Sequence, residues 1–294
     1  MAVNKEISAL LQLIDDPDQE VFDTVANKIL HYGPKIIPNL ENLWEETPDE
    51  KIQERIELLI HRVHYQDLQK EFRQWGDEED PDLFEGSLLV ARYRYPGLRM
   101  DNLIYELDKI KRNIWLELNN YLTPLEQVNV LNSMIYSYFN MKGAEVSYSR
   151  ANQFYINHVI ESRKGNAISI GMLYQMLCAQ LDIPIYAVNI PKQYILAYFN
   201  HPVEYAMPEA FQTQDIQFYI DPLQGQIYTV KDIEVYLKKI NIPFREAYSK
   251  PLSNRNIIRL LLTELSKCYG NKKELYRCEE LISLAEMLKN DAKF

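Results

Sequence analysis

The chain has 294 residues, of which 47% are hydrophobic and 25% charged, and these proportions are typical of a globular protein with a sizeable core. Its formal net charge of −10 argues against a nucleic-acid binder, because such proteins gain affinity from basic surfaces that neutralise phosphates. The three cysteines are too few, and odd in number, for a disulfide framework. The first residues lack a signal-peptide pattern and no apolar run approaches a membrane span, so we expect a cytoplasmic protein that binds neither nucleic acid nor membrane.

Three amphipathic helices are predicted over residues 1–75, and Thr47–Glu50 has the form of a capping box that opens the third. The segment from Leu10 to Trp44 resembles a HEAT-type repeat, a helix pair that stacks on its neighbours and can offer a face to a partner. We therefore expect a HEAT-like helical region over 1–75, with a plain helical subdomain as the alternative. Residues 76–82 contain five carboxylates and are predicted to be an acidic, solvated linker.

Beyond the linker the pattern changes from helices to a helix followed by short strands. Residues 83–140 are expected to be helical, and one buried helix is predicted over Gly165–Leu181. Three segments rich in strand-forming residues follow: Ile185–Val188, Tyr194–Phe199 and Phe218–Ile220. This order predicts a mainly helical α+β fold with a small antiparallel sheet in a core over residues 83–250.

The same order resembles the transglutaminase-like, papain-related core. In that family a Gly-x-Cys begins the helix, an Ile-Pro-like turn follows its end, a histidine precedes the next strand and an aspartate lies in an Asp-Pro pair. The sequence is most similar to the bacterial Sir-B-type transglutaminase-like proteins, over about residues 83–262. Three stretches carry this resemblance: Val159–Ile170, Val188–Leu196 and Asp221–Gly225.

Carried over residue by residue, the resemblance places the family's cysteine at Ala167, its histidine at Gln193 and its aspartate at Asp221. Alanine has no nucleophilic atom, and glutamine cannot transfer a proton near pH 7. The resemblance therefore implies a vestigial triad with no catalytic residue. The candidate cleft residues are Asn166, Ser169, Gln193, Tyr194 and Asp221.

Other candidate sites are weaker. His61 and His64 lie three residues apart on one predicted helix, but no third or fourth metal ligand accompanies them, so we expect no metal site. Cys178 is interpreted as a small core residue rather than a nucleophile. No nucleotide-binding glycine motif occurs, and we expect no cofactor.

Residues 251–294 are predicted to form a helical tail that resembles a tetratricopeptide-like helix pair, or a helical cap on the core. The leading hypothesis for function is a non-catalytic module that binds a protein or peptide partner. One alternative is a hydrolase or amide transferase of altered chemistry, in which Asp221 acts as a base with Ser169 or water. The other is a purely structural scaffold. The sequence does not fix the oligomeric state.

Overall fold

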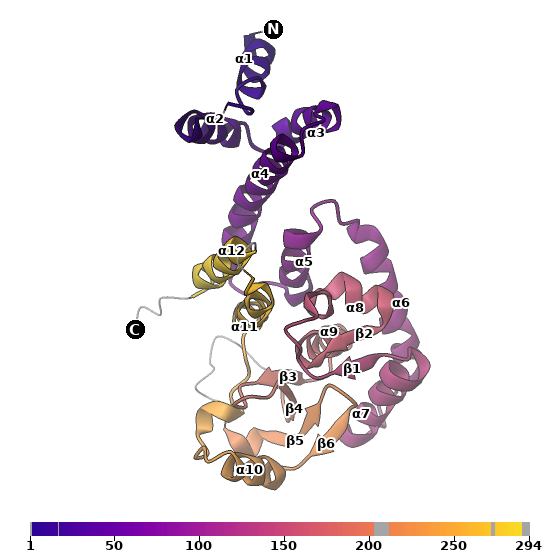
Figure 1. Ribbon diagram of the computed structural model, residues 1–294. Helices are drawn as coiled ribbons and strands as arrows, with labels where there is room; N and C mark the ends of the chain where they lie inside the picture. Colours follow the sequence, from indigo (N-terminus) through magenta and orange to yellow (C-terminus); the bar gives the residue numbers. More distant parts are fainter. Residues whose placement is uncertain (1, 17, 203–211, 272–273, 290–294) are drawn as a thin grey trace. The chain divides into compact units, whose positions relative to one another are not determined.

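A computed structural model describes residues 2–16, 18–202, 212–271 and 274–289 (Figure 1). Its contacts divide the chain into two compact units, one of residues 1–74 and 92–96 and the other of residues 75–91 and 97–294. The helices α4 (Glu50–Asp77) and α5 (Leu83–Arg94) each contribute residues to both units.

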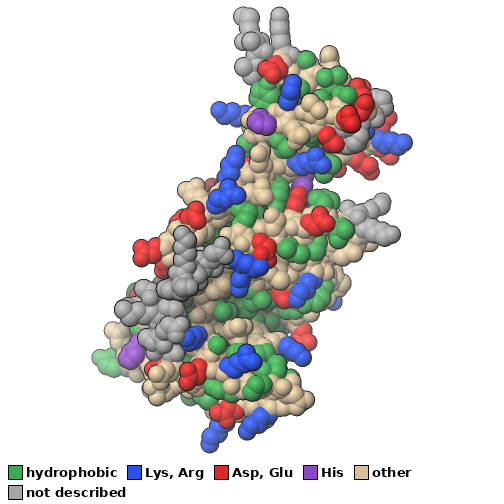
Figure 2. All heavy atoms as spheres, turned by 90° about the vertical axis from the view of Figure 1, so that its left-hand side faces the viewer, with side chains coloured by type: hydrophobic (Ala, Val, Ile, Leu, Met, Phe, Trp, Pro, Cys, Tyr) green, Lys and Arg blue, Asp and Glu red, His purple; other side chains and the backbone are tan. Residues whose placement is uncertain are grey.

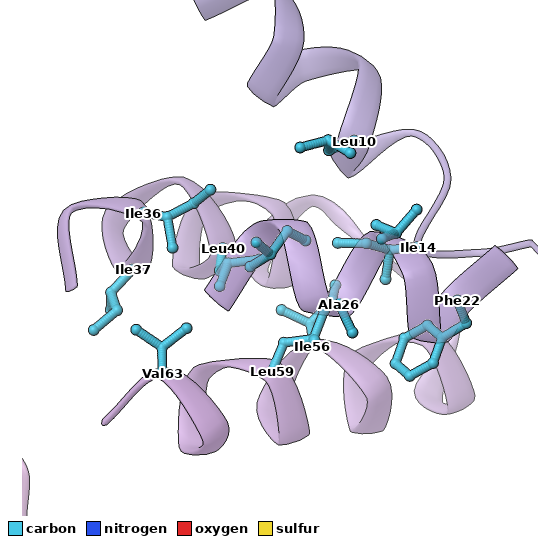
Figure 3. Packing of buried hydrophobic residues seen from close by; sticks show 12 residues of the cluster. Leu10, Ile14, Phe22, Ala26, Ile36, Ile37, Leu40, Ile56, Leu59 and Val63 are labelled. Atoms are coloured by element: carbon cyan, nitrogen blue, oxygen red, sulfur yellow. The ribbon is translucent and has the colours of Figure 1, made fainter. Parts of the chain in front are cut away.

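The first unit is a helical layer with its own apolar core. It contains α1 (Ala2–Leu11), α2 (Gln19–Tyr32), α3 (Ile37–Glu46) and most of α4. Apolar side chains from all four helices, and from the turn after α1, meet in one cluster (Figure 3). The members that Figure 3 labels are Leu10, Ile14, Phe22, Ala26, Ile36, Ile37, Leu40, Ile56, Leu59 and Val63.

The start of α4 differs from the predicted capping box. The Asp49 carboxylate accepts the backbone N–H groups of Lys51 at 2.8 Å and Ile52 at 3.3 Å, so Asp49 caps the helix. The Thr47 hydroxyl instead donates to the Leu43 carbonyl at 2.6 Å, at the end of the preceding helix. The prediction that Thr47 opens this helix was therefore wrong, because a second good capping residue lies two positions later.

The second unit contains the remaining helices. A π-helical stretch at Ser133–Tyr138 continues α7, and several short 3-10 turns link the elements. The helices are α6 (Met100–Glu117), α7 (Pro124–Asn132), α8 (Ile156–Ser162), α9 (Ala167–Ala179), α10 (Val230–Lys239), α11 (Asn254–Ser266) and α12 (Leu275–Met287).

Two sheets belong to this unit. The larger one is antiparallel, in the order β3 (Ile185–Val188), β4 (Ile195–Phe199), β5 (Ile216–Asp221) and β6 (Gln226–Tyr228). The smaller one pairs β1 (Lys142–Ala144) in parallel with β2 (Lys164–Asn166), the strand that leads directly into α9. This small sheet holds the chain that leads into the start of α9 (Figure 1).

Helices cover both faces of the larger sheet. Every residue of β4 is buried, as expected for a strand that is covered on both sides. Ile195, Ala197 and Phe199 pack with Ile233 and Leu237 of α10 in one cluster. The alternate β4 residues point to the opposite face, where α9 contacts β3 and β4. The predicted mainly helical α+β fold with a small antiparallel sheet is confirmed.

Some predicted regions remain predictions. The helix α4 continues through Asp77, and Glu78, Glu79, Asp80 and Asp82 are exposed. The predicted domain boundaries and the HEAT-like and tetratricopeptide-like resemblances stay predictions.

Figure 2 shows acidic and basic side chains interspersed over one face of the described residues. Among the helices that the structure describes, none has an apolar stretch of the length needed to cross a bilayer.

Candidate functional site

The candidate site is built around the first turn of α9. Asn166 precedes the helix, and its side-chain oxygen accepts the backbone N–H groups of Ile168 and Ser169, each at 3.0 Å. The Ser169 hydroxyl in turn accepts the Asn166 N–H at 3.0 Å, which completes a capping box. Gly165 allows this turn to be so tight, because a Cβ there would lie 2.6 Å from Ser169 Oγ. The start of the helix is therefore held by reciprocal hydrogen bonds.

Ser169 is not placed as a nucleophile. The residue is fully buried, and its hydroxyl donates to the Gln153 carbonyl at 2.6 Å. A nucleophilic serine needs a base that takes its proton, whereas this proton is held by a backbone carbonyl. Asn166 is also fully buried. These two candidate residues form the framework of the helix start.

Ala167, the first residue of α9, borders an open cavity of about 530 Å³. This volume falls in the range of pockets that bind small molecules or short peptide segments. Gln193 and Tyr194 line the same cavity, so the structure brings together the positions of the family's cysteine and histidine. The complete lining is Glu145, Val146, Tyr148, Ala167, Ile168, Asn189, Ile190, Pro191, Lys192, Gln193, Tyr194, Leu223, Leu260, Glu264 and Lys267.

The loop between β3 and β4 supplies the wall that holds Gln193. Its turn is closed by a hydrogen bond from the Gln193 N–H to the Ile190 carbonyl at 3.1 Å. Lys192 adopts a φ of +63° in this turn, a conformation that side chains with a Cβ disfavour. Both Lys192 and Gln193 are exposed, whereas Tyr194 is 7% exposed and its ring lies against Gly171 of α9.

Asp221 lies apart from the cavity lining. One of its carboxylate oxygens, Oδ1, accepts the Leu223 N–H at 2.8 Å, and its carbonyl accepts the Gly225 N–H at 2.8 Å. These bonds close the turn between β5 and β6, in which Gly225 has a φ of +73°. The structure therefore assigns Asp221 to the turn, and its side chain is not part of the cavity lining.

A polar cluster of three side chains forms another wall. The Glu264 carboxylate accepts the Tyr148 hydroxyl at 2.7 Å and pairs with the Lys267 ammonium at 2.6 Å. The Lys267 nitrogen also lies 5.4 Å from the centre of the Tyr148 ring. The hydrogen bond to Glu264 raises the pKa of Tyr148 and is also the main cause of the raised pKa of Lys267. This cluster is uncharged overall, because the two opposite charges cancel.

Two of the three cysteines, Cys178 and Cys268, are not placed as nucleophiles. Burial raises the pKa of the Cys178 thiol well above its usual value, and the residue is fully buried in the last turn of α9. Burial is also the main cause that raises the pKa of Cys268 to about 11. A reactive cysteine needs the opposite shift, because the thiolate is the nucleophile.

The histidine pair of α4 has aromatic and charged neighbours. The His61 ring stacks on Tyr65 and meets Tyr93 edge-on, and burial is the main cause that lowers the pKa of His64. Among the described residues no group of three or more His, Cys, Asp or Glu side chains is arranged to hold a metal ion.

Sequence reasoning identified Gln193 and Tyr194 in the cavity but missed most of its charged lining. The predicted site residues did not include Lys192, Glu264 or Lys267, all of which line the cavity. Tyr148 and Glu264 are 116 residues apart, so no local pattern predicts that they meet. A signal for Lys192 existed, since it follows a proline in a short loop between two predicted strands.

A family model and several relatives match a large part of this chain. The family model described as the transglutaminase-like superfamily matches residues 101–263, more than half of the chain. The UPF0162 protein BU173 of Buchnera aphidicola is 26% identical over 200 residues, which cover 66% of this chain and 68% of that protein. Protein SirB1 of Salmonella typhimurium is 23% identical over 200 residues, with the same coverage of both chains.

A eukaryotic relative matches a shorter stretch. F-box only protein 21 of Mus musculus is 30% identical over 108 residues, which cover 36% of this chain and 16% of that protein. No solved structure matches this chain.

Proposed function

The chain belongs to the transglutaminase-like superfamily, and we propose that it is a non-catalytic member that binds a peptide-like ligand in the cavity at the start of α9. The observation that carries this proposal is the cavity lining. The residues that border it in the described structure include no cysteine, serine, threonine or histidine, although the cavity lies where the family resemblance places the reaction centre. An open pocket without a thiol, an aliphatic hydroxyl or an imidazole base lacks the groups of thiol- and serine-based acyl transfer, and this supports binding.

The walls of the cavity suit a peptide. Ile168, Leu223 and Leu260 offer apolar surface, while the side chains of Asn189 and Gln193 offer amide donors and acceptors. A peptide has both kinds of group, since its backbone amides need hydrogen bonds and its side chains gain from burial. The capping box at Asn166 and Ser169 keeps this wall rigid, which lowers the entropic cost of binding.

The altered-enzyme alternative has less support than the binding proposal. It needs Asp221 to act as a base on Ser169 or on water, but the Asp221 carboxylate accepts a backbone N–H and lies outside the cavity lining. The Ser169 hydroxyl donates to a buried carbonyl. These contacts favour the binding proposal over the altered-enzyme alternative.

The proposal is tested by filling the cavity. A library of short peptides is screened for binding to the full chain, and the binders are measured again with Ala167→Trp, whose indole would occupy the space beside the helix start. We expect binding to be lost with Ala167→Trp and kept with Ala167→Ser, because serine adds a single atom. Peptide binding that Ala167→Trp leaves unchanged would place the site elsewhere, and amide hydrolysis or transfer that a thiol inhibitor blocks would overturn the non-catalytic assignment.

A second candidate function, docking of a protein partner on the helical unit, is favoured by one observation. A shallow groove of about 450 Å³ between α3 and α4 is lined by Glu41, Trp44, Glu45, Glu57 and Ile60. The Trp44 indole is 36% exposed and donates to Glu57 at 3.0 Å. Loss of a partner with Trp44→Ala, but not with Ala167→Trp, would favour this scaffold function over the cavity.

A further inference from the structure

Four charged residues line the cavity, and two of them neutralise each other. Lys267 and Glu264 form an ion pair at 2.6 Å, and Glu264 also accepts the Tyr148 hydroxyl. Glu145 and Lys192 are the other two, and both are exposed. Within the described part of the chain no carboxylate lies within ion-pair distance of the Lys192 ammonium. Lys192 is therefore a cation at the cavity with no protein anion beside it.

The backbone at Lys192 adopts a conformation that is costly for a residue with a side chain. Five described non-glycine residues have a positive φ, and three of them are Asn or Asp, which tolerate that conformation. The fourth, Arg163, closes α8 and its guanidinium donates to Glu106 at 2.7 Å. Lys192 has no comparable bond. Strained backbone of this kind is concentrated at sites of ligand binding.

We propose that the Lys192 ammonium recognises a carboxylate of the ligand that occupies this cavity; this inference rests on the proposed function. Ala167 and Ile168, which line the same cavity, belong to the first turn of the 13-residue helix α9, where the helix dipole adds to the positive potential. The apolar walls then hold the uncharged part of the same ligand.

A single-charge anion fits better than a phosphate dianion. The two lysines and two glutamates of the cavity lining sum to no net charge, so a dianion would meet no surplus of positive charge there. A carboxylate needs only one strong cationic partner, whereas phosphate groups are usually met by several donors. The chemistry therefore points to an acyl amino acid or a peptide with a free carboxyl group.

The experiment uses the full chain and two matched probes, N-acetyl-leucine and its neutral amide, with inorganic phosphate as a third. Binding is followed by the NMR shifts of the Ala167 and Gln193 amides. We expect the acid to bind and the amide to bind roughly tenfold to a hundredfold more weakly, because one charge-assisted hydrogen bond is lost. Lys192→Met removes the charge and keeps most of the length of the side chain. This variant is expected to weaken binding of the acid by the same factor and to leave binding of the amide unchanged. Lys238→Met, an exposed lysine of α10 outside the cavity, is the control.

The variant Lys192→Gly distinguishes the effect of the ammonium on binding from the effect of the strained backbone on stability. Glycine adopts a positive φ at no steric cost, so this variant is expected to melt at a higher temperature than Lys192→Met. Its affinity for the acid is expected to fall as much as that of Lys192→Met. Equal affinity for acid and amide, or tighter binding of phosphate, would overturn the carboxylate assignment. If Ala167→Trp removes binding of the acid but Lys192→Met does not, the cavity still binds the ligand and only the role of Lys192 is refuted. If neither probe binds the unmodified chain, both this inference and the acyl amino acid class fail, while the peptide screen with Ala167→Trp still decides the proposed function.

Discussion

Gly171, in the interior of α9, couples the helix to the cavity wall. An ideal Cβ at Gly171 would lie 2.7 Å from Cδ1 of the Tyr194 ring, closer still to Cε1, and 3.2 Å from Pro222. Tyr194 is 7% exposed, so its ring cannot move away without displacing other buried groups or entering the cavity. The substitution Gly171→Ala therefore sets helix propensity against packing.

The two effects have opposite signs and known sizes. Alanine in a helix interior is favoured over glycine by about 1 kcal/mol. Forcing an extra methyl group into a packed site costs about 1–3 kcal/mol. The contact is with ring atoms of a buried side chain, so we expect the packing cost to exceed the gain in helix propensity. The expected net destabilisation is about 1 kcal/mol.

A double-mutant cycle checks this reasoning. Gly171→Ala is measured alone and together with Tyr194→Leu, which removes the ring that the new methyl group would meet. Since the chain has two units, the readout is hydrogen exchange of the α9 amides, which reports on the second unit alone. In the Tyr194→Leu background, Gly171→Ala is expected to become stabilising. If Gly171→Ala stabilises both backgrounds equally, the ring is not held against the helix and the argument is refuted.

Three further predictions follow from single contacts. Asn166→Ala removes the cap of α9 and is expected to cost about 1–2 kcal/mol, measured by urea unfolding, with Asn166→Ser as the control that keeps an acceptor. Asp221→Ala leaves the Leu223 N–H without its acceptor and is expected to cost about 1 kcal/mol, whereas Asp221→Asn should cost less; equal losses would mean that charge, not the hydrogen bond, matters. Burial lowers the pKa of His64 in the folded state, so the imidazole takes up a proton more readily in the unfolded chain. The free energy of unfolding is therefore unaffected above the unfolded-state pKa of about 6.5 and decreases as the pH drops below it. His64→Gln should flatten the pH dependence of thermal unfolding in this window, and an unchanged slope would contradict the assignment; the charged groups that act on His64 are Glu41, His61, Asp67 and Arg92.

The fold could be predicted where local signals were strong. The helix predicted over Gly165–Leu181 is α9, and the three predicted strands correspond to β3, β4 and β5. These segments combine a clear apolar pattern with residues suited to their conformation, so the local and overall preferences agree. The short strands β1, β2 and β6 were not predicted, because three residues carry almost no pattern and pair only when the rest of the unit has folded.

The candidate site was harder to predict than the fold. The family resemblance identified Ala167 and Gln193, and both border the cavity. It also pointed to Asp221, but the carboxylate accepts the Leu223 N–H in a turn and is not part of the cavity lining. The ion pair of Glu264 and Lys267 belongs to the helical tail, and its place in the cavity wall depends on tertiary packing.

The start of α9 links these observations to function. The two residues of the capping box there are fully buried and bond to each other reciprocally, although the residue that follows Asn166 and borders the cavity, Ala167, has no reactive atom. A rigid helix start is needed in a cysteine enzyme to position the nucleophile, but it equally provides a fixed wall and a positive dipole for a bound anion. Lys192 lies in a strained turn beside the same cavity, so the helix dipole and this ammonium both support the proposal that the cavity binds an anionic ligand. Such binding would use the rigid helix start without requiring a nucleophile or a base at Ala167 and Gln193.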